Sequence, residues 1–289
     1  MLNYLLVLLA DFGYSTSFAL QNLYQKKEGN TIASGLLYNM IVGAVATVLM
    51  LVVCGFAPQF TPFSLLISII QTGLLTAYTV IGFYILKKGG MAFYTMFLMS
   101  GGMLVPYMWG VMFLDEELTL LRSIGVIVIT IAVIMTNYGK TKTTKTVLLL
   151  CVLVFFINGL TGVFAKLHQT ESVYATIGEF DLLFWGALFR FVVCASGYLV
   201  MKGKSANGVG LKSVSSFVAV IFATAATTTA EFINLVSASK LPASVLYPLI
   251  TGGTIIISSL FGAVFFKEKL SKTQLASIIL CFAGTCMFI

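Results

Sequence analysis

Three ionisable side chains lie inside long apolar runs of this sequence, and their chemistry needs an explanation. Asp11 interrupts the first run, and Arg190 and Glu231 lie deep in two later runs. An ionised side chain at the centre of a bilayer costs about 2.5 to 3.5 kcal/mol on insertion scales, so it must face an interior, pair with an opposite charge or become neutral. We therefore predict that these residues bind a substrate or exchange protons.

Polar side chains recur near these residues at intervals of three and four, a spacing that places them on one face of a helix. One stripe comprises Asp11, Ser15, Phe18, Asn22 and Gln25, and the other comprises Thr224, Thr227, Glu231 and Asn234. Over the whole chain, the candidate substrate-binding or ion-binding residues are Asp11, Tyr14, Asn39, Tyr78, Asn158, Arg190, Thr227, Glu231, Asn234 and Tyr247.

Each charged candidate also has a structural interpretation. Arg190 and Glu231 are opposite charges, so they could form a permanent salt bridge, or one that opens when substrate or a proton binds. Asp11 could exchange protons, or it could anchor its helix by a hydrogen bond. Lys166 lies close enough to the end of its run for its ammonium group to reach the membrane surface. His168, the only histidine, lies at a helix end, where a role as ligand is not expected.

Composition identifies the elements that must position these residues. The chain has 289 residues, of which 59% are hydrophobic and 9% charged, whereas soluble domains carry about 25% charged residues. A water-soluble fold is therefore excluded. Since a helix needs about 20 apolar residues to cross a bilayer, we predict spans near 3–24, 33–55, 63–86, 91–114, 119–138, 147–168, 178–202, 213–238, 242–265 and 271–289.

The polar segment 140–146 divides these spans into two sets of five. We predict a first five-helix repeat over 1–139, a cytoplasmic linker over 140–146 and a second repeat over 147–289. The loops are too short for a separate soluble domain, and the runs lack the alternation of transmembrane strands. The first span lacks a basic leader and a small-residue cleavage site, so we interpret it as a helix rather than a cleaved signal.

The net charge of +7 is explained by membrane topology rather than by nucleic-acid binding. Lysines follow the odd-numbered spans, at Lys26, Lys27, Lys87, Lys88, Lys140, Lys142, Lys145, Lys202, Lys204, Lys212, Lys267, Lys269 and Lys272. The other face has only Arg122 and Lys240. Because cationic loops stay in the cytoplasm, both termini of this cell-membrane protein are expected outside.

The two halves resemble each other. An offset of 152 residues aligns Gly101 with Gly253 and Glu116 with Glu268, among other matches. An offset of 144 residues aligns Leu23 and Gln25 with Leu167 and Gln169. An offset of 151 residues aligns Gly35 and Asn39 with Gly186 and Arg190. Because five is an odd number, the halves must cross the membrane in opposite senses. Inverted repeats are typical of secondary transporters.

The repeated motifs also resemble those of a known family. The segment Gly110-Val-Met-Phe-Leu-Asp-Glu-Glu-Leu118 and its counterpart Gly262-Ala-Val-Phe-Phe-Lys-Glu-Lys-Leu270 each precede a last apolar helix, as in the EamA-type repeat of the drug/metabolite transporter superfamily. The stretch Ala187-Leu-Phe-Arg-Phe191 is similar to the arginine-bearing helix of those repeats. The resemblance implies ten helices in two inverted halves and transport of a small metabolite.

One further segment resembles the same superfamily, and two features depart from it. Ala10-Asp-Phe-Gly13 is similar to the first helix of small multidrug resistance exporters, which implies that Asp11 binds protons and cationic substrate alternately. Asn39 stands where the family often has arginine. The lysine distribution is the reverse of the termini-inside topology expected of family members.

Two spans contain residues that weaken a helix. These candidate hinge residues are Gly101, Gly102 and Pro106 in the span 91–114, and Pro248, Gly252 and Gly253 in the span 242–265. Exposed backbone at membrane depth is tolerated where it lines a cavity, so we predict two hinge helices. The alternative is close packing of helices through small residues.

Together these features favour a secondary active transporter that works by alternating access. We expect proton coupling through Asp11 or Glu231, because desolvation can move carboxylate protonation toward neutral pH. A cation or a zwitterion such as an amino acid is the favoured substrate. We expect a monomer with no metal or cofactor; the five cysteines all lie in apolar runs. The alternatives are an intramembrane enzyme, whose catalytic motifs are missing, and a passive channel.

Overall fold

The computed structural model describes residues 2–88, 91–137, 144–204, 211, 213–265 and 271–288. These residues form helices joined by short loops. The helices are α1 (Leu2–Glu28), α2 (Ile32–Val53), α3 (Pro62–Lys87), α4 (Met91–Phe113), α5 (Leu120–Asn137), α6 (Lys145–Thr170), α7 (Glu179–Lys204), α8 (Val214–Ala238), α9 (Ala243–Phe265) and α10 (Lys272–Cys286).

The prediction of an all-helical membrane fold is confirmed for the described residues. Seven helices, namely α2, α3, α4, α6, α7, α8 and α9, are long and apolar enough to cross a membrane. The apolar parts of α5 and α10 are shorter. α1 has 27 residues, but the polar side chains of Asp11, Asn22 and Gln25 interrupt its apolar run. The described chain is therefore a multi-pass membrane protein. Most of the linker 140–146 lies outside the described residues.

Hydroxyl side chains fix where several helices begin. Thr31, Thr61, Thr144, Ser213 and Ser271 each accept a hydrogen bond from a backbone N–H in the first turn of the helix that follows. Such caps satisfy donors that have no partner within the helix and contribute about 1 kcal/mol each. The helices therefore begin within about two residues of the predicted spans.

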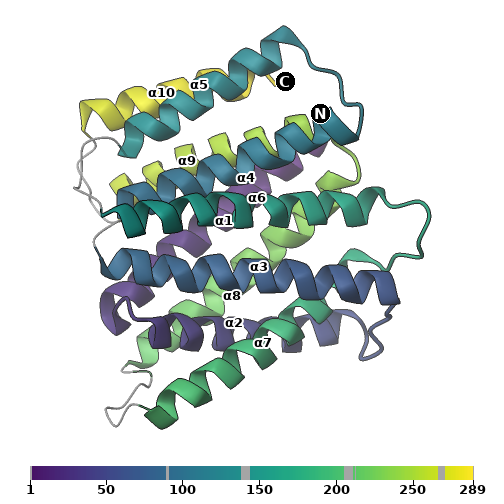
Figure 1. Cartoon of the computed structure of the whole chain (residues 1–289), viewed down its shortest axis with the longest axis vertical. Helices are drawn as coiled ribbons and strands as arrows, with labels where there is room; N and C mark the ends of the chain where they lie inside the picture. Colours follow the sequence, from purple (N-terminus) through teal and green to yellow (C-terminus); the bar gives the residue numbers. More distant parts are fainter. Residues whose placement is uncertain are drawn as a thin grey trace.

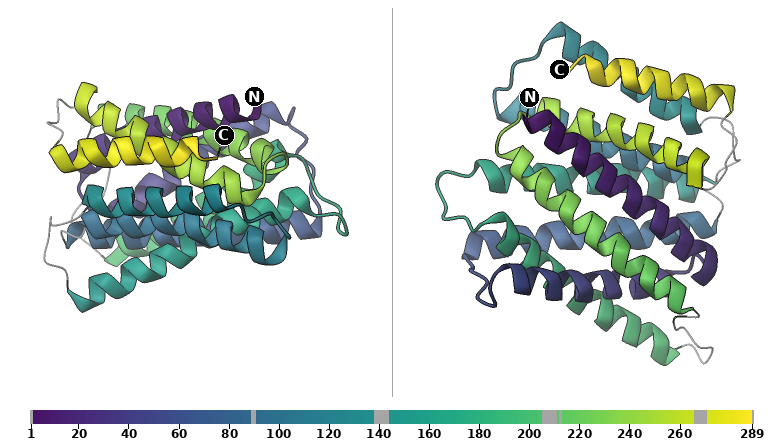
Figure 2. Two further views of the ribbon diagram at one scale, coloured as in Figure 1. Left: turned by 90° about the horizontal axis from the view of Figure 1, so that it is seen from above. Right: turned by 180° about the vertical axis from the view of Figure 1, so that it is seen from behind.

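Helices from the two halves of the chain pack against each other. α1 lies against α8 and α9, α2 against α7, α3 against α6 and α7, and α4 against α6 and α9. α5 and α10 pair at one end of the molecule (Figures 1 and 2). The Tyr4 hydroxyl donates to the Phe288 carbonyl at 3.4 Å, so the two ends of the chain lie together. The two predicted repeats are thus interleaved rather than set side by side.

The predicted hinge helices are continuous. α4 passes through Pro106 and α9 passes through Pro248 without a break. Their glycines lie at close helix contacts: a Cβ atom on Gly101 would overlap the Phe155 backbone of α6, and one on Gly252 would overlap Thr285 of α10. These contacts fit the alternative of close packing. Hinge motion stays a prediction.

Candidate functional site

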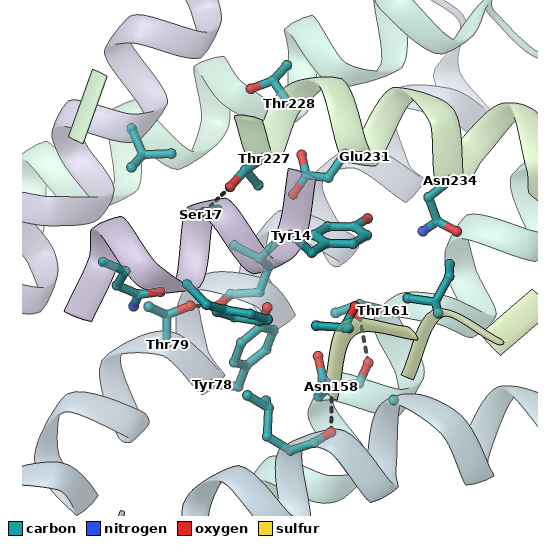
Figure 3. Close-up of a pocket in the computed structure, with 18 of the residues that line it drawn as sticks. Tyr14, Ser17, Tyr78, Thr79, Asn158, Thr161, Thr227, Thr228, Glu231 and Asn234 are labelled. Carbon is teal, nitrogen blue, oxygen red and sulfur yellow. Dashed lines mark hydrogen bonds between the residues drawn. The ribbon is translucent and has the colours of Figure 1, made fainter. Parts of the chain in front are cut away.

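A cavity of about 560 Å³ lies between helices of the two halves. α1, α2, α3 and α4 line it from the first half, and α6, α7, α8 and α9 line it from the second. Figure 3 shows residues of α1, α3, α6 and α8 around it. Pockets that bind small molecules typically have volumes of about 300 to 1,000 Å³. The cavity is therefore large enough for a small metabolite.

Most of the predicted binding residues line this cavity. They are Tyr14, Tyr78, Asn158, Arg190, Thr227, Glu231, Asn234 and Tyr247, together with the predicted hinge residue Gly102. The other candidates are not part of the lining, namely Asp11, Asn39, Gly101, Pro106, Pro248, Gly252 and Gly253. Side chains separated by more than 200 residues in sequence, such as Tyr14 and Asn234, thus face one space.

Arg190 does not form the predicted salt bridge. Its Nε and Nη2 atoms donate to Asn39 Oδ1, at 2.9 and 2.5 Å. No carboxylate oxygen of the described residues lies within 4.0 Å of its guanidinium. The interpretation as a permanent salt bridge is therefore wrong, because α7 packs on α2 and brings an amide rather than Glu231 to the arginine. A bridge that opens and closes stays a prediction.

Glu231 faces the cavity from α8. Its side chain and that of Tyr14 on α1 approach the cavity from neighbouring helices (Figure 3). Glu231 and Arg190 are the only carboxylate and the only guanidinium among the described residues that line it. The cavity thus has one anionic and one cationic side chain, which form no ion pair with each other.

Neutral polar groups cover much of the remaining wall. Asn158 Nδ2 donates to the Leu98 carbonyl at 2.8 Å, and Tyr247 donates its hydroxyl to the Gly162 carbonyl at 2.5 Å. Thr227 donates to the Ser17 hydroxyl (Figure 3). Buried polar groups are normally satisfied in this way. These bonds hold the cavity wall in place and leave other donors and acceptors facing the space.

Part of the α1 wall was not among the predicted binding residues. Ser17 and Gln21 line the cavity, together with Tyr14, but they lie beside the stripe predicted from Asp11. Tyr14, Ser17 and Gln21 follow intervals of three and four, so a stripe centred on Tyr14 would have identified them. Ser15, Phe18, Asn22 and Gln25 of the predicted stripe also line the cavity, so Asp11 is the only member of that stripe outside the lining.

Asp11 lies in the contact between α1 and α9. The side chain is buried, and its Oδ1 accepts a hydrogen bond from the Thr254 hydroxyl at 3.1 Å. A Cβ atom on Gly253 would overlap the other carboxylate oxygen. Ser15 also donates to the Thr254 carbonyl, at 3.3 Å. This environment fits the interpretation of Asp11 as an anchor, and its role in proton exchange stays a prediction.

Two charged residues hold the turn between α8 and α9. Lys166 does not reach the membrane surface as expected; it is 5% exposed, and its Nζ donates to the carbonyls of Ala238 and Leu241 at 2.8 and 2.6 Å. Glu116 accepts from the backbone N–H groups of Ala243 and Ser244 at 2.6 and 2.7 Å. Its repeat counterpart, Glu268, lies outside the described residues.

Other polar contacts join the loops at the same end of the helices. His168 Nε2 lies 2.9 Å from the Ser64 hydroxyl, which ties α6 to α3 and fits the expectation of a structural residue. The Glu171 carboxylate accepts from the backbone N–H of Val173 at 2.6 Å. This bond, with those from Tyr174 and Ser172, lowers the pKa of Glu171.

Comparison with known proteins gives a match at the level of the fold. No protein-family model and no curated protein sequence matches the chain. One crystal structure aligns with a TM-score of 0.75 at 14% sequence identity, over 99% of this chain and 95% of that one. The arrangement of the helices is therefore a fold that occurs in another protein over almost its whole length.

Proposed function

We propose that this protein is a secondary active transporter that moves a small zwitterionic or cationic metabolite, such as an amino acid, by alternating access. The observation that carries the proposal is the cavity between the halves, whose described lining has one carboxylate and one guanidinium that form no ion pair with each other. Arg190 would bind a substrate carboxylate, and Glu231 would bind an ammonium group. A tyrosine face, such as that of Tyr14, can attract the same cation.

The proposal includes an inverted repeat. Equivalent helices would be α1 and α6, α2 and α7, α3 and α8, α4 and α9, and α5 and α10. Under this scheme the contact of α1 with α8 corresponds to that of α6 with α3, and the contact of α4 with α6 corresponds to that of α9 with α1. The contacts of α2 with α7, of α4 with α9 and of α5 with α10 join equivalent helices.

Individual residues support the same scheme. Gly101 is tight against Phe155, and Gly253 is tight against Asp11. The two glycines are related by the offset of 152 residues, and Asp11 and Phe155 by the offset of 144. Rocking such halves would expose a central site to each side in turn. We likewise propose that the chain is an EamA-type transporter, on the motifs quoted above.

Transport into proteoliposomes driven by an imposed pH gradient tests the function. We expect saturable uptake and counterflow of an amino acid by the purified protein. Glu231→Gln keeps the shape of the side chain but cannot ionise, so it should abolish the response to the pH gradient, while counterflow persists with a weaker affinity for a substrate that carries an ammonium group. Asp11→Asn is the matched comparison in the α1–α9 contact, and retention of full coupling would remove Asp11 from the proton pathway.

Other outcomes would replace the proposal. Non-saturable electrical conductance would identify a channel, and a chemically modified product would identify an enzyme. A protein that neither binds nor exchanges any charged metabolite would contradict the transporter.

A further inference from the structure

The hydrogen bonds of Arg190 leave much of its guanidinium unused. A guanidinium has five N–H donors. Asn39 takes one from Nε and one from Nη2, both through the single atom Oδ1. The remaining donors have no partner among the described residues. Because Arg190 lines the cavity, these donors are available to whatever enters it.

Asn39 is itself fixed. It is 0% exposed, and its Nδ2 donates to the Gly35 carbonyl at 2.8 Å in the preceding turn of α2. That bond turns the amide so that its oxygen, rather than its nitrogen, faces Arg190. The arginine therefore meets a prepared acceptor, and its orientation across the α2–α7 contact is set before any ligand binds.

The neutrality of the Asn39 amide is the decisive chemical feature. An aspartate has nearly the same shape, but it would form a charge-assisted pair with the guanidinium and cancel its charge. An arginine at this position, as at the matching position of the second half, would set two positive charges against each other. Asparagine holds the guanidinium without forming an ion pair with it.

Glu231 does not take over that compensation. It lines the same cavity on α8, yet it lies beyond the 4.0 Å that defines an ion pair with Arg190. Burying a cation without a directly bonded counter-ion is costly, and an anionic ligand that accepts the free N–H groups would reduce that cost. The cavity is therefore prepared for a ligand that brings the missing negative charge.

We propose that Asn39 is a positioning residue that makes the cavity selective for substrates carrying a carboxylate or a similar anionic group. By holding Arg190 through a neutral amide, it keeps a positively charged, correctly oriented donor set free for that group. This selectivity rests on the proposed function and makes it more specific. Zwitterions are accepted, and simple cations without a carboxylate are not.

The test compares Asn39→Asp with Asn39→Ala in the full-length protein. Asn39→Asp exchanges the hydrogen bond to the Gly35 carbonyl for an ion pair with Arg190, and its unfolding midpoint is measured first to show that it folds. It should weaken binding of amino acids by about tenfold or more, while binding of the matching decarboxylated amines is unchanged or tighter. Asn39→Ala removes the acceptor that orients Arg190 without cancelling the charge, so amino acid binding should weaken less than in Asn39→Asp, and amino acids should still bind more tightly than amines. Ligand-induced thermal stabilisation, measured over matched pairs, gives both affinities.

A chemical readout separates this inference from the transport function. In an Arg122→Lys background, Arg190 is the remaining arginine, so phenylglyoxal adducts counted by intact mass report its availability. We expect modification of Arg190, protection by acetate or an amino acid but not by an amine, and slow modification of Asn39→Asp. Such a result stands even if proteoliposomes show no transport.

Three results would overturn the inference. The first is tight binding of amino acids by Asn39→Asp. The second is an equal loss of amino acid and amine binding in both variants, which indicates a purely structural asparagine. The third is protection of Arg190 by amines as effectively as by carboxylates.

Discussion

Gly253 of α9 packs directly against Asp11 of α1. A Cβ atom here would overlap the Asp11 carboxylate, which is already bonded to Thr254. Gly253→Ala should therefore separate the two helices or displace the carboxylate, and overpacking of this kind costs about 1 to 3 kcal/mol. We expect a lower midpoint of thermal unfolding in detergent.

Gly73 provides the control for this prediction. It lies within α3 and is exposed, and a Cβ atom there would have no neighbour within 4 Å. Gly73→Ala should raise the unfolding midpoint slightly, because alanine favours helix by about 1 kcal/mol relative to glycine. Equal effects of the two substitutions would show that Gly253 is not a close contact.

At this scale the sequence predicted the important residues but not their partners. Arg190, Glu231 and Asp11 were identified because charge is rare in apolar runs. Their partners are Asn39 for the arginine and Thr254 for Asp11. The hydrogen-bonding groups of a polar residue in a membrane helix can face a cavity, a side-chain amide or a backbone group of another helix. All three arrangements give the same spacing of polar residues along the sequence. The choice depends on which neighbouring helix comes close.

At the scale of the helices, the N-terminus of α9 is capped by a residue from the first half of the chain. The Glu116 carboxylate accepts two N–H groups of its first turn. The backbone of Asp115, the residue before Glu116, has a φ of 49° and turns the chain there. An anion at a helix N-terminus complements both the free donors and the helix dipole. Glu116→Ala should therefore destabilise the protein by about 1 to 2 kcal/mol, measured as a fall in the thermal unfolding midpoint.

Glu117 is the matched control for Glu116. It is the next residue and is exposed, so Glu117→Ala removes the same charge from the same loop without touching α9. We expect its unfolding midpoint to stay close to that of the wild type. If the two variants unfold alike, the loss in Glu116→Ala is not due to capping.

The bounds of the helices could be predicted well and their rotation less well. Apolar length and capping hydroxyls such as Thr61 and Ser271 mark where helices begin. On α1, Ser15, Phe18, Asn22 and Gln25 of the predicted stripe line the cavity, but Asp11 of the same stripe packs against α9. Periodicity defines a polar face but does not distinguish a face on a cavity from a face on another helix, and α1 has both.

For the molecule as a whole, the lysine distribution predicts which side faces the cell exterior. Val173 lies in the loop between α6 and α7 and is 81% exposed, and Leu211 lies on the lysine-rich side. In a cysteine-free background, Val173→Cys should react with a membrane-impermeant maleimide added to intact cells. Leu211→Cys should react only after the cells are permeabilised.

The reverse labelling pattern would contradict the topology predicted from lysines. It would instead agree with the termini-inside arrangement implied by the family resemblance. Because Tyr4 and Phe288 are in contact, one experiment orients both ends of the chain.

The division of paired residues between the halves has a consequence for biosynthesis. Glu116 emerges from the ribosome well before Ala243 and Ser244, and Asn39 emerges well before Arg190. Until the second half is synthesised, Glu116 and Asn39 therefore lack the donors that they bind in the folded protein. A chain truncated after the linker would lack the donors that Glu116 and Asn39 bind, so we expect its helices to be less stable than in the whole protein.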